Sequence, residues 1–386
     1  MKMMSGRLIL TMAILFSSVG FTEETQEKII SLMTYNTENL FDTEHDEGKT
    51  DYTYLPLAVK KASPKIMKYC KSMSNSYYRR DCLTMDWNQE TLDRKINQIA
   101  KVILSYDNGN GPDIIVLEEV ENINALRQLK NKGLRGHGYI EAVLIEGPDN
   151  RGIDVGIISR FKLDGEAKLN KVDLSVIERG SGRFSPNTRG ILQATFKVGK
   201  NRLTVFGNHW SSQANIDQAR VVAAQTLYEA ALKVEDSAVV ATGDFNTLED
   251  DNPNGINLFL LNEDQEDSFY DAQDPTKDLF SLSTLTGGEE GSHWYRGEWT
   301  YLDKIFLLKS TTLRGPGRTC GISRCIRPVW DSFKVHKPHF AVHDLRYIDR
   351  QTGQEVVHRG VPLRFDAKTG EGFSDHLPVV IKLKFQ

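Results

Sequence analysis

Six places in this 386-residue sequence put acidic, amide or histidine side chains at the end or the start of an expected β-strand. The residues are Asn36, Glu118, Glu119, Asn208, His209, Asp244, Asn246, Asp303, Asp375 and His376. Carboxylate and amide oxygens are the ligands that Mg²⁺ and Mn²⁺ prefer, and histidines oriented by acids can transfer protons. An isolated acid of this kind is usually a turn or cap residue. Six sites of matched chemistry in one chain favour a catalytic metal centre.

Short apolar runs and two helical patterns would position these side chains. Strands are expected at 29–35, 113–117, 139–145, 155–159, 191–197, 202–206, 237–242, 304–308 and 379–383. Helices are expected at 91–104, where aliphatic residues recur at helical spacing, and at 216–234, which is rich in Ala and Leu. Several strands meet through hairpins, so the pattern favours two packed sheets flanked by helices over one parallel sheet.

Seven stretches around these residues occur in the order typical of a known family. They are LMTYNTEN (32–39), PDIIVLEEV (112–120), DVGIISR (154–160), GNHW (207–210), GDFN (243–246), YLDKI (301–305) and FSDHLPV (373–379). With these motifs the chain resembles the endonuclease/exonuclease/phosphatase superfamily, which includes pancreatic-type deoxyribonucleases and abasic-site endonucleases. The resemblance covers residues 27–386 as one domain. It implies an α/β fold, a four-layer sandwich of two mainly antiparallel β-sheets flanked by helices.

The resemblance also implies a role for each matching residue. The metal would be held by Asn36, Glu119 and Asp375. The catalytic residues would be His209, His376, Asp303, Asp244 and Asn246. Asp303 would orient His376, and Asp244 and Asn246 would bind the phosphate and the attacking water. The substrate phosphate would be contacted by Arg189 and, on a weaker match, by Arg151. Glu118 stands where the family often has Gln, and no acid matches the partner of His209 unambiguously.

The implied reaction is hydrolysis of a phosphodiester by direct water attack, with Mg²⁺ or Mn²⁺ as the cofactor and Ca²⁺ as an auxiliary ion. A divalent ion would neutralise the phosphate oxygens and stabilise the transition state. Either Asp244 or the His376–Asp303 pair would take the proton from water. His209 or a water bound to the metal would protonate or stabilise the leaving oxygen.

The first 20 residues have the order of a cleavable secretory signal peptide. Lys2 and Arg7 precede an apolar run at 8–16, and small residues follow at Ser18 and Gly20. The run is shorter than the ~20 residues that span a bilayer. We therefore expect cleavage near Gly20 and a secreted or periplasmic monomer without stable membrane association.

Four cysteines agree with an oxidising compartment. The simplest of three pairings joins Cys70 to Cys82 and Cys320 to Cys325. Zinc binding is the weaker interpretation, because neither pair has the two-residue spacing or the nearby histidines of a structural zinc site.

The polar segment at 42–90 is expected to be an insertion with too few apolar residues for a core. It carries basic residues interleaved with tyrosines, a composition that suits phosphate contact and base stacking; these are Lys49, Lys60, Lys61, Lys65, Lys68, Lys71, Arg79, Arg80, Tyr52, Tyr54, Tyr69, Tyr77 and Tyr78. A solvated loop closed by Cys70 and Cys82 explains the segment equally well.

Three functions compete for this sequence. The formal net charge of -4 means that any attraction to nucleic acid must come from a local basic surface. The favoured hypothesis is a nuclease that hydrolyses DNA, and RNA as well. The alternative is a sphingomyelinase-like phospholipase C or another phosphoesterase; such lipases tend to carry an exposed apolar hairpin, which this sequence does not suggest. A non-catalytic binding module of the same fold is the third, and it would not need every acid and both histidines.

Overall fold

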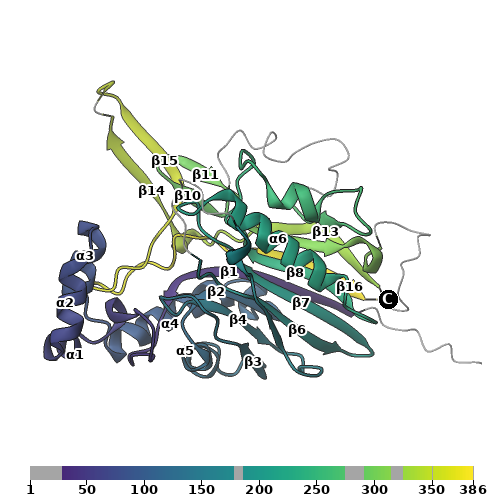
Figure 1. Cartoon of the computed structure of the whole chain (residues 1–386), viewed down its shortest axis with the longest axis horizontal. Helices are drawn as coiled ribbons and strands as arrows, with labels where there is room; N and C mark the ends of the chain where they lie inside the picture. The colour runs from purple at the N-terminus through teal and green to yellow at the C-terminus, as the bar shows by residue number, and fades with distance from the viewer. Residues whose placement is uncertain (1–27, 178–185, 274–290, 314–324, 350, 386) are drawn as a thin grey trace, which may run out of the picture.

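Two six-stranded β-sheets stack face to face, and helices cover their outer faces (Figure 1). The computed structural model describes residues 28–177, 186–273, 291–313, 325–349 and 351–385. The first sheet contains β1 (Lys28–Leu40), β2 (Ile114–Val120), β3 (Glu141–Leu144), β4 (Asp154–Ser159), β13 (Ile326–Val335) and β16 (Val379–Phe385). The second contains β5 (Lys168–Asn170), β6 (Ile191–Val198), β7 (Asn201–His209), β8 (Ala238–Asp244), β9 (Phe269–Asp271) and β12 (Asp303–Leu308).

Three apolar layers hold the sandwich together. Aliphatic side chains of both sheets, including Val116 and Val205, fill the space between them. Helices α4 (Gln89–Leu104) and α5 (Ile123–Gln128) pack on the outer face of the first sheet, and α6 (Asp217–Ala231) packs on that of the second. The four-layer α/β sandwich is therefore confirmed.

One parallel pair of strands lies at the centre of each sheet, and the other pairings are antiparallel. The parallel pairs are β1/β2 and β7/β8, so their carboxyl ends lie at one edge of the sandwich. Strand β16 runs antiparallel to β1, and β12 runs antiparallel to β8. Residues that precede β16 and begin β12 therefore reach the same edge, which explains why the polar residues found at strand ends meet.

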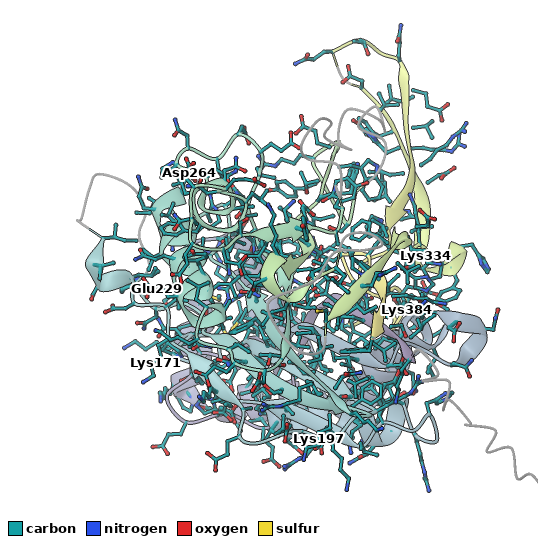
Figure 2. The ribbon with its side chains drawn as sticks, turned by 90° about the vertical axis from the view of Figure 1, so that its right-hand side faces the viewer. Lys171, Lys197, Glu229, Asp264, Lys334 and Lys384 are labelled. Carbon is teal, nitrogen blue, oxygen red and sulfur yellow. A yellow bond between two sulfur atoms is a disulfide. The ribbon has the colours of Figure 1, made fainter. Side chains whose placement is uncertain are left out.

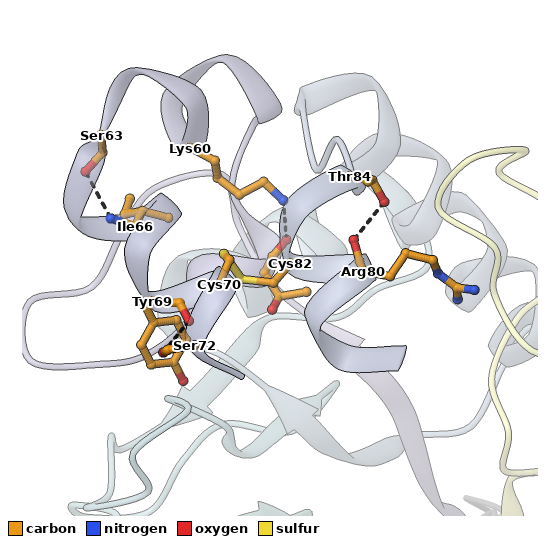
Figure 3. The surroundings of a disulfide bond; sticks show 10 residues. Lys60, Ser63, Ile66, Tyr69, Cys70, Ser72, Arg80, Cys82 and Thr84 are labelled. Carbon is orange, nitrogen blue, oxygen red and sulfur yellow. Dashed lines mark hydrogen bonds between the residues drawn. A yellow bond between two sulfur atoms is a disulfide. The ribbon is translucent and has the colours of Figure 1, made fainter. Parts of the chain in front are cut away.

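The segment at 42–90 forms a helical insertion with a small core, contrary to our expectation that it lacks one. It contains α1 (Leu57–Ala62), α2 (Pro64–Ser72) and α3 (Ser76–Thr84). The expected disulfide between Cys70 and Cys82 joins α2 to α3 (Figure 3). Tyr52, Leu55 and Ile66 pack around it. The two disulfide-bonded cysteines are part of this core. A count of apolar residues alone therefore underestimates the size of the core. Cys320 and the first 27 residues lie outside the described residues.

Two hairpins that the sequence pattern did not predict lie beside the edge of the sandwich where the polar strand ends meet. They are β10 (His293–Tyr295) with β11 (Glu298–Thr300), and β14 (Val342–Ile348) with β15 (Glu355–Pro362). The second projects from the sandwich as an arm, on the same side as α1–α3 (Figure 1). The ring of Trp294 lies 5.2 Å from that of His358 between centroids, so the two hairpins touch.

The surface carries charges of both signs, in keeping with the small net charge. Figure 2 shows Lys171, Glu229 and Asp264 pointing outward from different parts of the sandwich. Among the residues that the structure describes, no helix has both the length and the apolar character needed to cross a membrane.

Candidate active site

Strand ends from both sheets bring four of the predicted residues into contact. Asn36 Nδ2, on β1, donates a hydrogen bond of 3.1 Å to Asp244 Oδ2, on β8. His209 Nε2, at the end of β7, lies 3.8 Å from Asp244 Oδ2 and 3.9 Å from Glu119 Oε1. All but Glu119 are buried, and the Glu119 side chain is 17% exposed. The group therefore joins the two sheets and keeps one carboxylate open to solvent.

Asp303 and His376 form the expected hydrogen-bonded pair, which we call the His376–Asp303 pair. His376 Nδ1 lies 2.7 Å from Asp303 Oδ2, and its Nε2 lies 4.0 Å from Asp244 Oδ2. Burial alone would lower the pKa of His376, but the Asp303 carboxylate, with Asp244 and Asp375, raises it well above the ordinary value. The ring therefore carries a proton near neutral pH.

Unusual backbone conformations occur at three positions of the site. Gly243 has φ 141°, and a Cβ there would lie 2.0 Å from the Asn208 carbonyl oxygen, so only glycine fits where β7 meets β8. Asn246 adopts φ 47°. Glu119 adopts φ 60° where the pairing of β2 with β4 shifts register. A bulge of this kind re-aims a side chain, and here it turns Glu119 toward the site.

Asp244 is held by its neighbours and is less acidic than usual. Its Oδ1 accepts a hydrogen bond of 2.9 Å from the backbone N–H of Asn246. Burial, against the opposing effect of His376 and with a smaller contribution from Asp303, raises the pKa of Asp244 to about 6. Asn246 Nδ2 donates to the Trp210 carbonyl oxygen. The carboxylate is thus fixed in place and has a pKa close to neutrality.

No acid among the described residues hydrogen-bonds to Nδ1 of His209. Its Nδ1 is buried and makes no hydrogen bond. Burial, and then the positive charges of Arg189 and Arg151, lower its pKa well below the ordinary value. The sequence left the partner acid of His209 open, and the structure places the ring near two arginines, whose charges disfavour its protonation.

The two predicted arginines lie on the His209 side of the site in different surroundings. Arg189 is buried, donates from Nη2 to the Trp210 carbonyl oxygen at 2.7 Å, and has Nη1 3.5 Å from Asp149 Oδ2. Arg151 is exposed at the surface; although the surrounding protein atoms displace water and lower its pKa, the Glu119 and Asp149 carboxylates raise the pKa overall. Both therefore supply positive charge next to Glu119 and His209.

Glu118, at the position where the family often has Gln, is buried beneath the site. Its Oε1 accepts a hydrogen bond of 2.8 Å from the Thr34 hydroxyl. Burial, reinforced by Asp303, raises the pKa of Glu118 well above the ordinary value. The surroundings therefore favour the protonated form of Glu118, which resembles the amide of Gln in shape and charge.

A network around Asp375 contains residues that the sequence analysis did not select. Arg364 contacts Glu38 Oε1 through two of its nitrogens and lies 3.3 Å from Asp375 Oδ2. Lys95, fully buried on α4, donates to the Phe373 carbonyl oxygen at 2.8 Å. Burial raises the pKa of Glu38 to about 7 and lowers that of Lys95 to about 8. Only Glu38 could have been found, since it lies in the first motif; nothing local marks Arg364 or Lys95.

The residues present fit a divalent ion. Ser374 donates from Oγ to the Asn36 carbonyl oxygen at 2.7 Å, so the chain leading to Asp375 lies against β1. Asn36, Glu119 and Asp375 offer the oxygen ligands that Mg²⁺ and Mn²⁺ prefer. The raised pKa of Asp244 and the unpaired, buried Oδ1 of Asp303 show more buried acid than the local cations balance. A bound cation would correct this imbalance.

One protein family and several solved structures are similar to this chain. The model of the endonuclease/exonuclease/phosphatase family matches residues 80–385. The solved structures that resemble the chain include a family member from Bacteroides thetaiotaomicron, with 16% identity, coverage of 94% of this chain and 99% of that chain, and a TM-score of 0.48.

Two further neighbours show the same degree of likeness. The human Nocturnin catalytic domain with bound sulfate has 14% identity, coverages of 94% and 98% and a TM-score of 0.48. D. rerio TDP2 in complex with a single-strand DNA product has 15% identity, coverages of 93% and 99% and a TM-score of 0.46. No curated protein matches the chain. Because the family model covers most of the sequence, the chain belongs to the endonuclease/exonuclease/phosphatase family and is a hydrolase of phosphoester bonds.

Proposed function

We propose that this chain is an exported nuclease that requires Mg²⁺ or Mn²⁺ and hydrolyses DNA, and RNA as well. The observation that carries the catalytic part is the His376–Asp303 pair, which faces Asp244 across 4.0 Å in a buried site. A proton donor and a proton acceptor held this close suit the hydrolysis of a phosphodiester, in which water must lose a proton and the leaving oxygen must be stabilised.

The side chains divide the work of this reaction. Asn36, Glu119 and Asp375 would hold the ion, which when bound neutralises charge on the phosphate. Asp244, whose pKa is raised to about 6, is ionised at neutral pH and can take the proton of the attacking water. His376 carries a proton and can donate it, and Asp303 fixes its orientation. Arg189 would contact the phosphate beside a neutral His209.

Exposed aromatic and basic residues flank the site and support a nucleic-acid substrate. On α3, Tyr77 and Tyr78 are 54% and 59% exposed, and Arg80 lies over the Tyr77 ring. On β10, Tyr295 is 56% exposed, with Arg296 over its ring. Such pairs suit base stacking and phosphate contact.

The other tyrosines of the insertion do not contribute to this surface. Tyr52 and Tyr69 pack edge to face, and Tyr54 stacks on Phe41. Lys60 is buried and donates to the Thr53 carbonyl oxygen. Only part of the insertion therefore fits nucleic-acid contact, and the rest is structural.

The residues at the end of the β14–β15 arm help to judge the phospholipase alternative. Tyr347 and Ile348 are exposed near its end, but the turn beyond them contains Asp349, Gln351 and Thr352, whose polar groups hydrogen-bond to one another. An arm that enters a bilayer would need an apolar tip. The arm therefore favours a soluble polyanion over a lipid surface as the substrate.

A substrate panel tests the proposal. The protein lacking residues 1–20 is incubated with Mg²⁺ and double-stranded DNA, single-stranded DNA, RNA or sphingomyelin. We expect cleavage of the nucleic acids and its loss in EDTA. His209→Ala and His376→Ala should be inactive, with His137→Ala as a control outside the site. Turnover of sphingomyelin alone would overturn the nuclease proposal.

Export is tested separately, because it rests on the first 20 residues and not on the site. When the full chain is expressed with its N-terminus intact, N-terminal sequencing of the product should show cleavage near Gly20, with activity in the periplasm or the medium. Retention of an uncleaved chain inside the cell would contradict it.

A further inference from the structure

The β10–β11 hairpin places a third histidine, His293, against the catalytic residues. His293 pairs with His376 in an isolated β-bridge, and the ring centroids lie 4.6 Å apart. Two hydrogen bonds to Ser292 hold the hairpin there: the backbone N–H of Leu377 donates to its carbonyl oxygen at 2.7 Å, and that of Asp303 to its hydroxyl at 3.2 Å. The position of His293 is therefore fixed by the same segments that carry the His376–Asp303 pair.

His293, Asp375 and His376 have the spacing of a metal site. Each offers one ligand atom, and these atoms all lie within 4.8 Å of one another. Ligand atoms around a tetrahedral zinc ion are about 3.4 Å apart, given metal–ligand bonds of about 2.0–2.1 Å. Small side-chain rotations would therefore close the site around an ion.

Both rings already have the partners that orient a metal ligand. His376 Nδ1 lies 2.7 Å from Asp303 Oδ2, and His293 Nδ1 lies 3.2 Å from the Thr300 hydroxyl. A ring that uses Nδ1 in this way leaves Nε2 for a metal, and a carboxylate behind a histidine strengthens it as a ligand. Arg364 contacts Oδ2 of Asp375 and leaves Oδ1 for an ion.

The ligand set selects a different ion from the cofactor site. Two imidazoles with one carboxylate suit Zn²⁺ and similar transition metals, whereas Mg²⁺ prefers oxygen ligands alone. We propose that His293, Asp375 and His376 form a transition-metal site at which Zn²⁺ inhibits this enzyme. The ion occupies the His376 nitrogen that the reaction needs for proton transfer, and it draws Asp375 away from the cofactor. The inhibitory part rests on the proposed function; the binding site does not.

Zinc binding is measured first, without reference to activity. Metal-free protein in millimolar Mg²⁺ is titrated with Zn²⁺ by calorimetry and with Co²⁺ by visible absorption. The comparison is between wild type, His293→Gln and the matched control His358→Gln, which alters a histidine of the neighbouring arm. We expect one site in the wild type and the control, and an affinity about tenfold to a hundredfold weaker in His293→Gln. Equal affinity in all three proteins would overturn the site.

Inhibition is measured second, with DNA as the substrate at saturating Mg²⁺. Zn²⁺ should inhibit the wild type and His358→Gln at the concentrations that fill the site, and His293→Gln should need at least tenfold more. If His293→Gln loses tight binding but keeps its sensitivity to Zn²⁺, the inhibitory role is overturned. If zinc binds at this site but no phosphodiester is cleaved under any condition, the site stands and the proposed function fails.

Discussion

At the scale of single residues, the pKa values of two histidines in one site are shifted in opposite directions by their neighbours. His376 lies among three carboxylates, and its pKa is raised well above the ordinary value despite burial. His209 is equally buried, but it faces Arg189 and Arg151, and its pKa falls well below the ordinary value. Groups whose pKa values are driven apart in this way can serve as donor and acceptor in one reaction.

Asp303→Asn tests the orientation of His376. An amide keeps the shape of Asp303 but removes the charge that favours the protonated ring. We expect kcat to fall about 10²–10⁴-fold, with a smaller change in KM. The alkaline limb of the pH profile should move to lower pH, because without the Asp303 charge the His376 ring loses its proton more easily. Circular dichroism should show an unchanged fold. A kcat equal to that of the wild type would exclude a catalytic role for the pair.

A second residue-scale prediction concerns stability. Burial raises the pKa of Asp154 to about 7, although its Oδ1 accepts a hydrogen bond from the backbone N–H of Gly147. Between about pH 4, near the ordinary value, and pH 7 the folded state therefore holds a proton that the unfolded state has lost. The free energy of unfolding should fall as pH rises through this window.

Asp154→Asn isolates this effect, because the amide retains the acceptor and cannot ionise. Relative to the wild type, the variant should gain on the order of 2 kcal/mol in unfolding free energy between pH 5 and pH 8. Urea denaturation at the two pH values in EDTA measures the difference. Parallel pH dependence in the two proteins would show that Asp154 ionises normally.

At the scale of elements, segments added to the sandwich supply the walls of the site. The α1–α3 insertion presents Tyr77 and Tyr78, the β10–β11 hairpin presents Tyr295 and His293, and Arg364 follows the β14–β15 arm. Burial and then Asp81 raise the pKa of Tyr77, and smaller effects of Arg364, which lowers it, and Glu38, which raises it, link α3 to the centre. In the proposed function the sandwich would carry the reacting groups, and the added segments would meet the substrate.

Replacing Tyr77 and Tyr78 together with Ala tests this division. Base stacking contributes about 1–3 kcal/mol per base, so affinity for single-stranded DNA should fall about tenfold. Turnover of a small phosphodiester that reaches only the centre should not change. The double Phe variant keeps both rings and should bind like the wild type. If the Ala variant binds single-stranded DNA as tightly as the wild type, α3 does not contact the substrate.

At the scale of the whole molecule, the two sheets meet at an edge crowded with acids. Asn36 and Glu119 come from one sheet, Asp244 and Asp303 from the other, and Asp375 from the segment before β16. Burying carboxylates without enough positive charge costs free energy. The folded state should therefore gain stability when a divalent ion binds.

Thermal unfolding measures that gain. At 100 times its Kd, Mg²⁺ should stabilise the protein by about 2.7 kcal/mol, which corresponds to a rise in Tm of a few degrees. Glu119→Gln should lose most of the shift, since the amide removes a charged ligand. A control variant such as Glu229→Gln, on the surface of α6, should keep it. No shift in the wild type would contradict metal binding at this edge.

The sequence by itself determined the family, the strands that carry the motifs and the identity of the central residues. These follow from local information: apolar runs of strand length, helical spacing at 91–104, and polar residues at strand ends. Tertiary structure decided how those residues act. Arg364 meets Glu38 across 326 positions, and His376 meets Asp303 across 73.

The protonation states, the missing acid of His209 and the place of His293 all depend on such distant pairings. A pKa is set by burial and by charges within a few ångströms, and the chain brings those charges together only when the two sheets pack. Short strands such as β10 and β11 are three residues each and carry no pattern of their own. For this reason the sequence could name the acids, amides and histidines of the site, while their distances, burial and neighbouring charges follow only from the folded chain.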